Sequence, residues 1–194
     1  MNGVSNYLWV NRFFLMILIT ITPIFIPALL HREPVKADSP LVIGVVETLR
    51  IIIVYDNYPY KEGLKTSWGF SCYIEADGIR LLFDTGGNPS LLLENMAKLG
   101  LDVEKIDIIF LSHIHGDHTG GLKGVLEEGV RAKVYLPASF PSSTKDAIRS
   151  YGCEVVEVKG AREVSKGMAT TGELGVWVKE QALIINTTKG LVVI

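Results

Sequence analysis

Apolar runs along the chain predict a domain that begins with strands and continues as a mixture of strands and helices. Strands are expected over residues 49–55, 69–75, 79–83, 106–111, 133–136, 154–158, 172–178, 182–186 and 191–194. Helical spacing of apolar residues predicts helices over residues 89–99, 119–128 and 143–151. An Asp77-Gly78 pair between the second and third strands predicts a tight hairpin. The pattern as a whole predicts an α+β domain.

The run over residues 106–111 is interrupted only by Asp107, as expected of a strand in a sheet buried on both faces. Directly after it comes His113-Ile114-His115-Gly116-Asp117-His118, which holds three of the four histidines in the chain of 194 residues. A cluster that follows a buried strand in this way is expected at the edge of the sheet.

Imidazole and carboxylate are ligands that Zn²⁺, Mn²⁺ and Fe²⁺ accept, and a bound ion of this kind can turn water into a nucleophile near neutral pH. His113 and His115, two residues apart as the strand ends, can point to one ion. Gly116 tolerates the turn that would let Asp117 and His118 face a second ion. The alternative is a polar turn whose histidines only make local hydrogen bonds.

The H-x-H-x-D-H cluster and an earlier strand that closes on Asp84, within residues 81–86, resemble the metallo-β-lactamase superfamily. Within it, residues 74–78, 81–86, 111–122 and 180–183 resemble the branch named for dihydropterin-methyl-ribofuranosylaminobenzene phosphate synthase. The likeness extends over about residues 48–194. It implies an αββα sandwich, here with the second half incomplete.

The resemblance also implies the roles of the residues in the cluster. His113 and His115 would bind the first of two divalent metals, with Zn expected and Mn or Fe as alternatives. Asp117 and His118 would bind the second metal, and Asp117 would also act in catalysis by orienting the attacking water. Asp84 would support these ligands without touching the metal.

In relatives, a third histidine, a bridging carboxylate and a last histidine complete the two metal sites, all C-terminal to the cluster. No histidine follows His118 here, and residues 190–194 resemble the strand that leads into the loop with the third histidine. We therefore expect a truncated or partial chain. Because each metal would have two protein ligands, metal analysis of the purified protein should find well under one tightly held ion per chain. Two ions retained through dialysis would refute the truncation.

The triplet Asp84-Thr85-Gly86 after an apolar run also resembles the catalytic triplet of aspartic proteases, in which two aspartates share a proton. The chain has one copy, so a homodimer would have to supply the second. That interpretation leaves the histidine cluster unexplained.

The N-terminal part of the chain is strongly apolar. Hydrophobic residues make up 48% of the chain, its mean hydropathy is +0.30, and residues 13–30 carry no charge. With Arg12 before this run and Ala37 at a plausible cleavage position, residues 1–37 are predicted to be a signal peptide or membrane anchor. The alternative is a buried core helix. The domain over residues 38–194 would then be membrane-anchored or exported, on the extracytoplasmic side.

The net charge of −2, the pI near 6.1 and the lack of a dense Lys/Arg run argue against a nucleic-acid partner and favour a small-molecule substrate. Cys72 and Cys153 are too few for a disulfide scaffold. Trp68, Phe70 and Tyr73 could line a substrate pocket, although aromatic residues on strands more often pack in the core.

The sequence leaves three functional interpretations open. The first is a metal-dependent hydrolase that uses metal-activated water. The second is a synthase or transferase of the same fold that acts on a phosphorylated pterin-type intermediate. The third is a non-catalytic truncated remnant, tethered to the membrane and completed by a separate C-terminal fragment.

Overall fold

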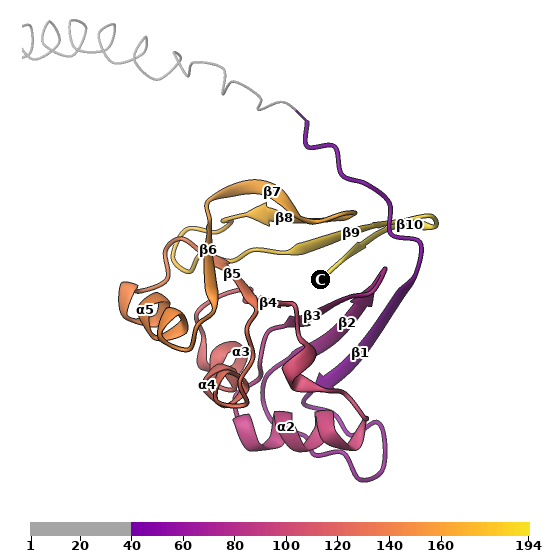
Figure 1. The fold of residues 1–194 in the computed structure, drawn as a ribbon, viewed down its shortest axis with the longest axis vertical. Coiled ribbons are helices and arrows are strands. Elements are labelled where there is room, and N and C mark those ends of the chain that lie inside the picture. Colours follow the sequence, from indigo (N-terminus) through magenta and orange to yellow (C-terminus); the bar gives the residue numbers. More distant parts are fainter. Residues whose placement is uncertain (1–39) are drawn as a thin grey trace, which may run out of the picture. The chain divides into compact units, whose positions relative to one another are not determined.

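The computed structural model describes residues 40–194, which form two β-sheets and a layer of helices (Figure 1). The first sheet has the order β1-β2-β3-β4-β5-β6 and comprises β1 (Leu49–Tyr55), β2 (Ser71–Ala76), β3 (Ile79–Phe83), β4 (Ile108–Phe110), β5 (Lys133–Pro137) and β6 (Glu154–Val158). The second has the order β10-β9-β8-β7 and comprises β7 (Gly160–Ser165), β8 (Met168–Gly172), β9 (Leu183–Thr187) and β10 (Gly190–Val193).

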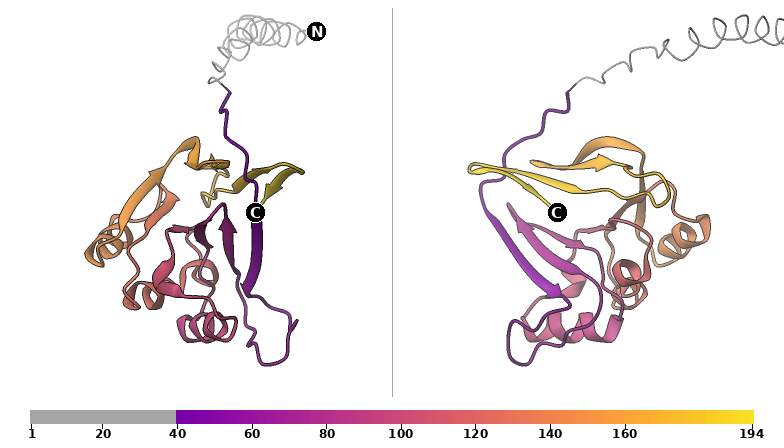
Figure 2. Two further views of the ribbon diagram at one scale, coloured as in Figure 1. Left: turned by 45° about the vertical axis from the view of Figure 1, so that its right-hand side comes forward. Right: turned by 180° about the vertical axis from the view of Figure 1, so that it is seen from behind.

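The helices of the described region lie on one side of the first sheet (Figures 1 and 2). They are α2 (Pro89–Lys98), the 3₁₀ turn η2 (Val103–Lys105), α3 (Gly116–Thr119), α4 (Leu122–Glu127) and α5 (Ser142–Ser150). One cluster of buried apolar side chains fills the space between these helices and the six-stranded sheet, and a second lies between the two sheets. Residues 40–194 thus form three layers: helices, a first sheet and a second sheet.

Side-chain alternation along the central strands explains this arrangement. Leu82 and Ile109 belong to the cluster on the helical side, whereas Leu81 and Ile108 belong to the cluster between the sheets. β4 is buried throughout and pairs with β3 and β5 in parallel, which confirms the prediction of a strand covered on both faces.

The predicted hairpin between β2 and β3 is confirmed. Asp77 and Gly78 have φ angles of 47° and 87°, the positive values that a two-residue hairpin turn requires. The Asp77 carboxylate accepts hydrogen bonds from the backbone N–H of Glu47 at 3.1 Å, and from the backbone N–H and hydroxyl of Thr48 at 2.8 and 3.0 Å. The turn therefore holds the start of the described chain against the first sheet.

These hydrogen bonds, first those from Thr48 and Glu47, lower the pKa of Asp77. A lowered pKa in the folded state stabilises the fold above the ordinary Asp pKa of about 4, and this stabilisation is lost as the pH falls through the lowered value. We expect Asp77→Asn, which keeps the turn, to be less stable than the wild type at neutral pH, with a difference that shrinks below about pH 4. Urea unfolding midpoints at the two pH values measure this, and a pH-independent difference would contradict it.

Two of the expected elements differ from the structure. Residues 172–178 are predicted as a strand, but β8 ends at Gly172, and the residues beyond it form a loop whose base is a single antiparallel bridge between Leu174 and Glu180. The helix expected over residues 119–128 is α4, which begins later, at Leu122, and a separate short helix, α3, precedes it within the histidine cluster. β7 was not predicted, and β8 overlaps an expected strand only at Gly172.

The apolar run over residues 13–30 and the proposed signal or anchor over residues 1–37 lie outside the described residues. Within residues 40–194, no helix is long and apolar enough to cross a lipid bilayer. Cys72 and Cys153 are free, buried thiols in different core clusters, and burial raises the pKa of Cys72 to about 12. Both cysteines therefore serve as small apolar core residues.

Candidate metal centre

The candidate site lies where β3 and β4 end side by side. The two strands are parallel, with Phe83 opposite Phe110, so the residues that follow them meet at one edge of the sheet. Asp84 follows β3, and its backbone N–H donates to the carbonyl of Phe110 at 2.8 Å. The histidine cluster follows β4 after Leu111 and Ser112. The fold thus brings together two sequence motifs that are separated by almost thirty residues.

The cluster itself is a turn that leads into α3. The carbonyl of His115 accepts hydrogen bonds from the backbone N–H groups of His118 and Thr119, both at 3.0 Å, which starts the helix. β4 ends at Phe110, so His113 and His115 lie beyond the strand. Strand alternation was therefore the wrong reason for placing their side chains together, and the turn into α3 is the right one.

Asp84 is fully buried and binds both sides of the cluster through its carboxylate. Oδ1 accepts from the backbone N–H of Ser112 at 2.7 Å, and Oδ2 accepts from the Ser112 hydroxyl at 2.6 Å. Nδ1 of His118 lies 2.7 Å from the same Oδ2. Asp84 has a φ angle of 52°, a left-handed conformation that Asp tolerates better than most residues. Asp84 thus contacts the cluster directly, and its role in supporting metal ligands stays a prediction.

The contact with Asp84 determines the chemical state of His118. Because the carboxylate can only accept, Nδ1 of His118 carries a proton, and the lone pair of Nε2 is left for another partner. The hydrogen bond that Nδ1–H of His118 donates to Asp84 raises the pKa of His118, and partial burial opposes this effect. Nε2 faces the carboxylate of Asp117, with 3.6 Å between Nε2 and Oδ2.

These spacings fit pairs of metal ligands. Two atoms that bind one zinc ion at about 2.0–2.1 Å in tetrahedral geometry lie about 3.4 Å apart, close to the separation of Asp117 Oδ2 and His118 Nε2. Two imidazoles on such an ion have ring centres about 5 Å apart. The ring centroids of His113 and His115 are 4.8 Å apart, and those of His113 and His118 are 4.1 Å apart.

The four side chains therefore gather in one place, and the shortest ring separation joins His113 and His118, which the sequence assigns to different ions. Among residues 40–194, no group of three or more His, Cys, Asp or Glu side chains is arranged to hold one ion. The donor set fits divalent metals with two protein ligands each, and metal binding by His113, His115, Asp117 and His118 stays a prediction. Burial, and then the neighbouring His118, lower the pKa of His113, which keeps this ring neutral and able to bind a metal.

Two residues that support the cluster, Ser112 and Gln181, are not singled out by the sequence. Ser112 connects Asp84 to His113, because its hydroxyl lies 2.9 Å from Nδ1 of that histidine. Gln181 is buried, and its backbone N–H and its Nε2 donate to the carbonyls of Ser112 and Leu111, each at 2.9 Å. Gln181 falls within residues 180–183, which carried part of the family resemblance, but a local pattern could not reveal contacts with residues so distant in sequence.

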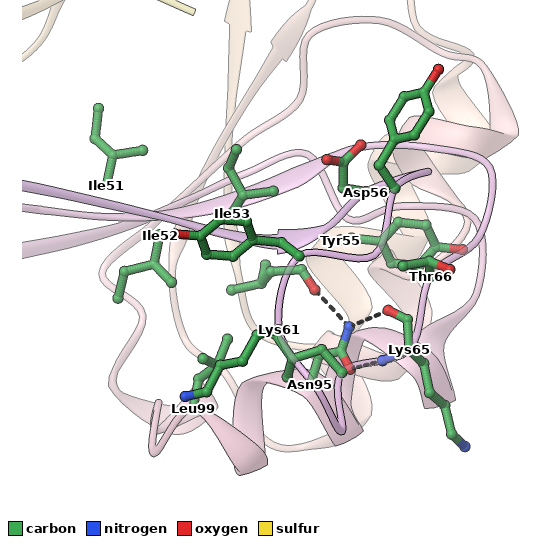
Figure 3. A pocket seen from close by; sticks show the side chains of 14 residues that line it. Ile51, Ile52, Ile53, Tyr55, Asp56, Lys61, Lys65, Thr66, Asn95 and Leu99 are labelled. Carbon is green, nitrogen blue, oxygen red and sulfur yellow. Dashed lines mark hydrogen bonds between the residues drawn. The ribbon is translucent and has the colours of Figure 1, made fainter.

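A cavity of about 410 Å³ is lined by residues of β1, by Asn95 of α2 and by the connection over residues 56–66 (Figure 3). Its walls are mostly apolar, and Asn95 ties them together by accepting from the backbone N–H of Lys65 and donating to the carbonyls of Lys65 and Val54. None of the predicted metal ligands lines it. The cavity is therefore separate from the candidate chemistry.

The three aromatic residues considered as pocket lining divide between surface and core. Tyr73 is buried on the helical side of the first sheet, and Phe70 packs against Phe83 between the sheets. Trp68 is 72% exposed and lies next to the site, since Gly69 and Phe70 contact the backbone of Asp117. Only Trp68 remains a candidate for substrate contact.

A helical layer, two packed sheets and a histidine cluster at the ends of two parallel strands define an α/β sandwich with a candidate metal centre at the edge of its first sheet. The chain belongs to the metallo-beta-lactamase superfamily, whose sequence profile matches residues 69–194. The fold expected from the sequence is therefore confirmed. Divalent metals, commonly zinc, are typical of this superfamily.

Individual relatives match over shorter stretches. The chain is 40% identical over 91 residues to a 7,8-dihydropterin-6-methyl-4-(beta-D-ribofuranosyl)-aminobenzene-5'-phosphate synthase of Methanocaldococcus jannaschii, which covers 44% of this chain and 31% of the relative. It is 26% identical over 121 residues to a ribonuclease Z of Alkaliphilus oremlandii, which covers 61% of this chain and 37% of the relative. The chain thus spans about a third of these relatives.

The metallo-beta-lactamase fold protein YhfI from Bacillus subtilis has a similar solved structure, with a TM-score of 0.56 and 15% identity. The match covers 75% of this chain and 61% of that structure. At this level of identity the likeness establishes the fold alone.

Proposed function

We propose that this chain carries the metal-binding part of a metal-dependent hydrolase that uses metal-activated water and acts on a small molecule. The observation that carries the proposal is the gathering of His113, His115, Asp117 and His118 at the ends of β3 and β4, with Asp84 buried beneath them. When bound, a divalent ion would supply a nucleophilic water near neutral pH and polarise the substrate.

The chain's own residues would prepare the site in three ways. Asp84 fixes the orientation of His118 through Nδ1 and so presents Nε2 toward the position of the metal. Asp117 places a carboxylate oxygen beside that nitrogen, where it can orient the attacking water. His113, neutral because of its lowered pKa, offers a second imidazole 4.1 Å away between ring centroids.

A synthase or transferase that acts on a phosphorylated pterin-type intermediate is the second candidate function. The 40% identity over 91 residues to the Methanocaldococcus jannaschii synthase favours it. Both candidates require the same metal centre and differ in the reaction that it supports. A nucleic-acid substrate, as in the ribonuclease Z relatives, is a weaker candidate because the chain has a net charge of −2.

Titration of the metal-free protein with Co²⁺, followed by visible absorption, tests the proposed metal centre. We expect saturable binding that His115→Ala or Asp117→Asn weakens by at least ten- to a hundredfold, since each removes one of two ligands from an ion. Asp146→Asn is the matched control, because Asp146 is an exposed carboxylate on α5 that pairs with Arg149. Equal Co²⁺ affinity in all variants would contradict the proposal.

Hydrolysis of bis(p-nitrophenyl) phosphate and p-nitrophenyl acetate at saturating Zn²⁺ then separates the two candidate reactions. Turnover that disappears with EDTA and in Asp117→Asn supports a hydrolase. Metal binding without turnover favours the synthase. The absence of both metal binding and turnover would contradict both candidate functions.

A further inference from the structure

The hydroxyl of Ser112 occupies a position in which its single hydrogen can satisfy only one neighbour. Its Oγ lies 2.6 Å from Oδ2 of Asp84 and 2.9 Å from Nδ1 of His113. A hydroxyl donates one hydrogen bond and can accept two, whereas a carboxylate only accepts. The direction of the hydrogen bond to Asp84 therefore decides whether Nδ1 of His113 donates or accepts a hydrogen bond.

If the Ser112 hydrogen pointed to His113, two oxygens would face each other at 2.6 Å without a hydrogen between them. The hydroxyl must therefore donate to Asp84 and accept from His113. Nδ1 of His113 then carries the proton, and the lone pair lies on Nε2.

We infer that Ser112 is a positioning residue. Its hydroxyl donates to the buried Asp84 carboxylate, must therefore accept from His113, and so fixes this histidine as the Nδ1–H tautomer. The consequence for metal binding rests on the proposed function, since Nε2 is thereby left free as a ligand atom. Asp84 thus sets the tautomers of two histidines, of His118 by direct contact and of His113 through Ser112.

Both sheets hold Ser112 in the position that this role requires. On one side, its backbone N–H donates to Oδ1 of Asp84, at the end of β3. On the other side, its carbonyl accepts from the backbone N–H of Gln181, just before β9, and the Gln181 side chain binds the carbonyl of Leu111. Thr170 of β8 in turn donates to Gln181 Oε1 at 2.7 Å. The Ser112 hydroxyl is therefore held in place by its backbone and is not a mobile surface group.

The test is long-range ¹H–¹⁵N NMR of the imidazole rings in the metal-free full chain, at about pH 8, where ordinary histidines are neutral. In the wild type we expect His113 as the Nδ1–H tautomer. In Ser112→Ala, which removes the acceptor, we expect a shift to the Nε2–H tautomer or to a mixture. Ser112→Thr keeps the hydroxyl and should retain the wild-type tautomer.

Ser71→Ala is the matched control. Ser71 is also a buried serine whose hydroxyl donates to Asp84, at 2.7 Å, but it binds the backbone carbonyl instead of the carboxylate. We expect both alanine variants to lower the unfolding midpoint, whereas only Ser112→Ala changes the tautomer and raises the Zn²⁺ dissociation constant, by about ten- to a hundredfold.

An Nε2–H tautomer of His113 in the wild type, or an unchanged tautomer in Ser112→Ala, would overturn the inference. The expected tautomers in a wild type that binds no Zn²⁺ would instead support the role of Ser112 and contradict the proposed function. The two claims can therefore fail separately.

Discussion

Replacing Asp84 with alanine should lower the free energy of unfolding by about 3–5 kcal/mol and weaken metal binding at least tenfold. The change leaves the backbone N–H and hydroxyl of Ser112 and Nδ1 of His118 without their acceptor in a buried site. It also puts alanine at a φ angle of 52°, which costs about another 1 kcal/mol. Urea unfolding and Co²⁺ titration measure the two effects.

Asp84→Asn separates the effect of the Asp84 charge from the effect of its side-chain shape. Asparagine keeps the size and the tolerance for positive φ, and it offers one acceptor where the carboxylate offers two. We expect a smaller loss of stability than for alanine but a comparable loss of metal affinity. A loss below about 1 kcal/mol in Asp84→Ala would mean that the buried carboxylate does not hold the cluster together.

Gly69→Ala should have the second large effect, of about 3 kcal/mol on stability, together with weaker metal binding. Gly69 has a φ angle of 132°, which non-glycine residues rarely adopt, and a Cβ at this position would overlap the carbonyl oxygen of Asp117. The neighbouring Phe70 N–H donates to that same oxygen at 3.2 Å. Adding a methyl group would therefore displace Asp117 itself.

Gly63→Ala provides the matched control in the same connection between β1 and β2. Gly63 also has a positive φ, 84°, but a Cβ there would meet no described atom within 4 Å. We expect it to cost about 1 kcal/mol and to leave metal affinity unchanged. Equal effects of the two substitutions on metal binding would show that the approach of Gly69 to Asp117 is irrelevant to the site.

The sequence predicts well those parts of the fold whose signals are local. The hairpin at Asp77-Gly78, the buried strand β4 and the pairing of Asp84 with the histidine cluster follow from turn chemistry, apolar runs and motifs. β7 escaped prediction because its residues 160–165 are mostly polar and exposed, so its pairing with β8 is determined by tertiary contacts.

The supporting residues of the site were harder to predict, and the reason is distance along the chain. Ser112 and Asp84 are 28 residues apart, and Gln181 and Leu111 are 70 residues apart, so no periodic pattern connects them. Gly69 raises the same difficulty. Glycine is required there because a Cβ would overlap the carbonyl oxygen of Asp117, which is distant in sequence. The candidate ligands come from the sequence and their metal binding stays a prediction, whereas the contacts that orient them are visible only in the fold.

The fold leaves the reaction open, because one fold can carry many chemistries. The synthase and ribonuclease Z relatives share the superfamily and differ in the substrates that their names imply. Trp68 is exposed, and its neighbours Gly69 and Phe70 contact the backbone of Asp117, so a substrate contact of Trp68 stays a prediction.

The central claim is that divalent metals bind at the histidine cluster. Anomalous scattering at the zinc edge, from crystals soaked in excess Zn²⁺, tests it most directly because the signal locates the ion. The account predicts anomalous peaks about 2.0–2.2 Å from the ligand atoms of His113 and His115 and of Asp117 and His118. Saturating Zn²⁺ that gives no peak there, or peaks only elsewhere on the protein, would contradict it.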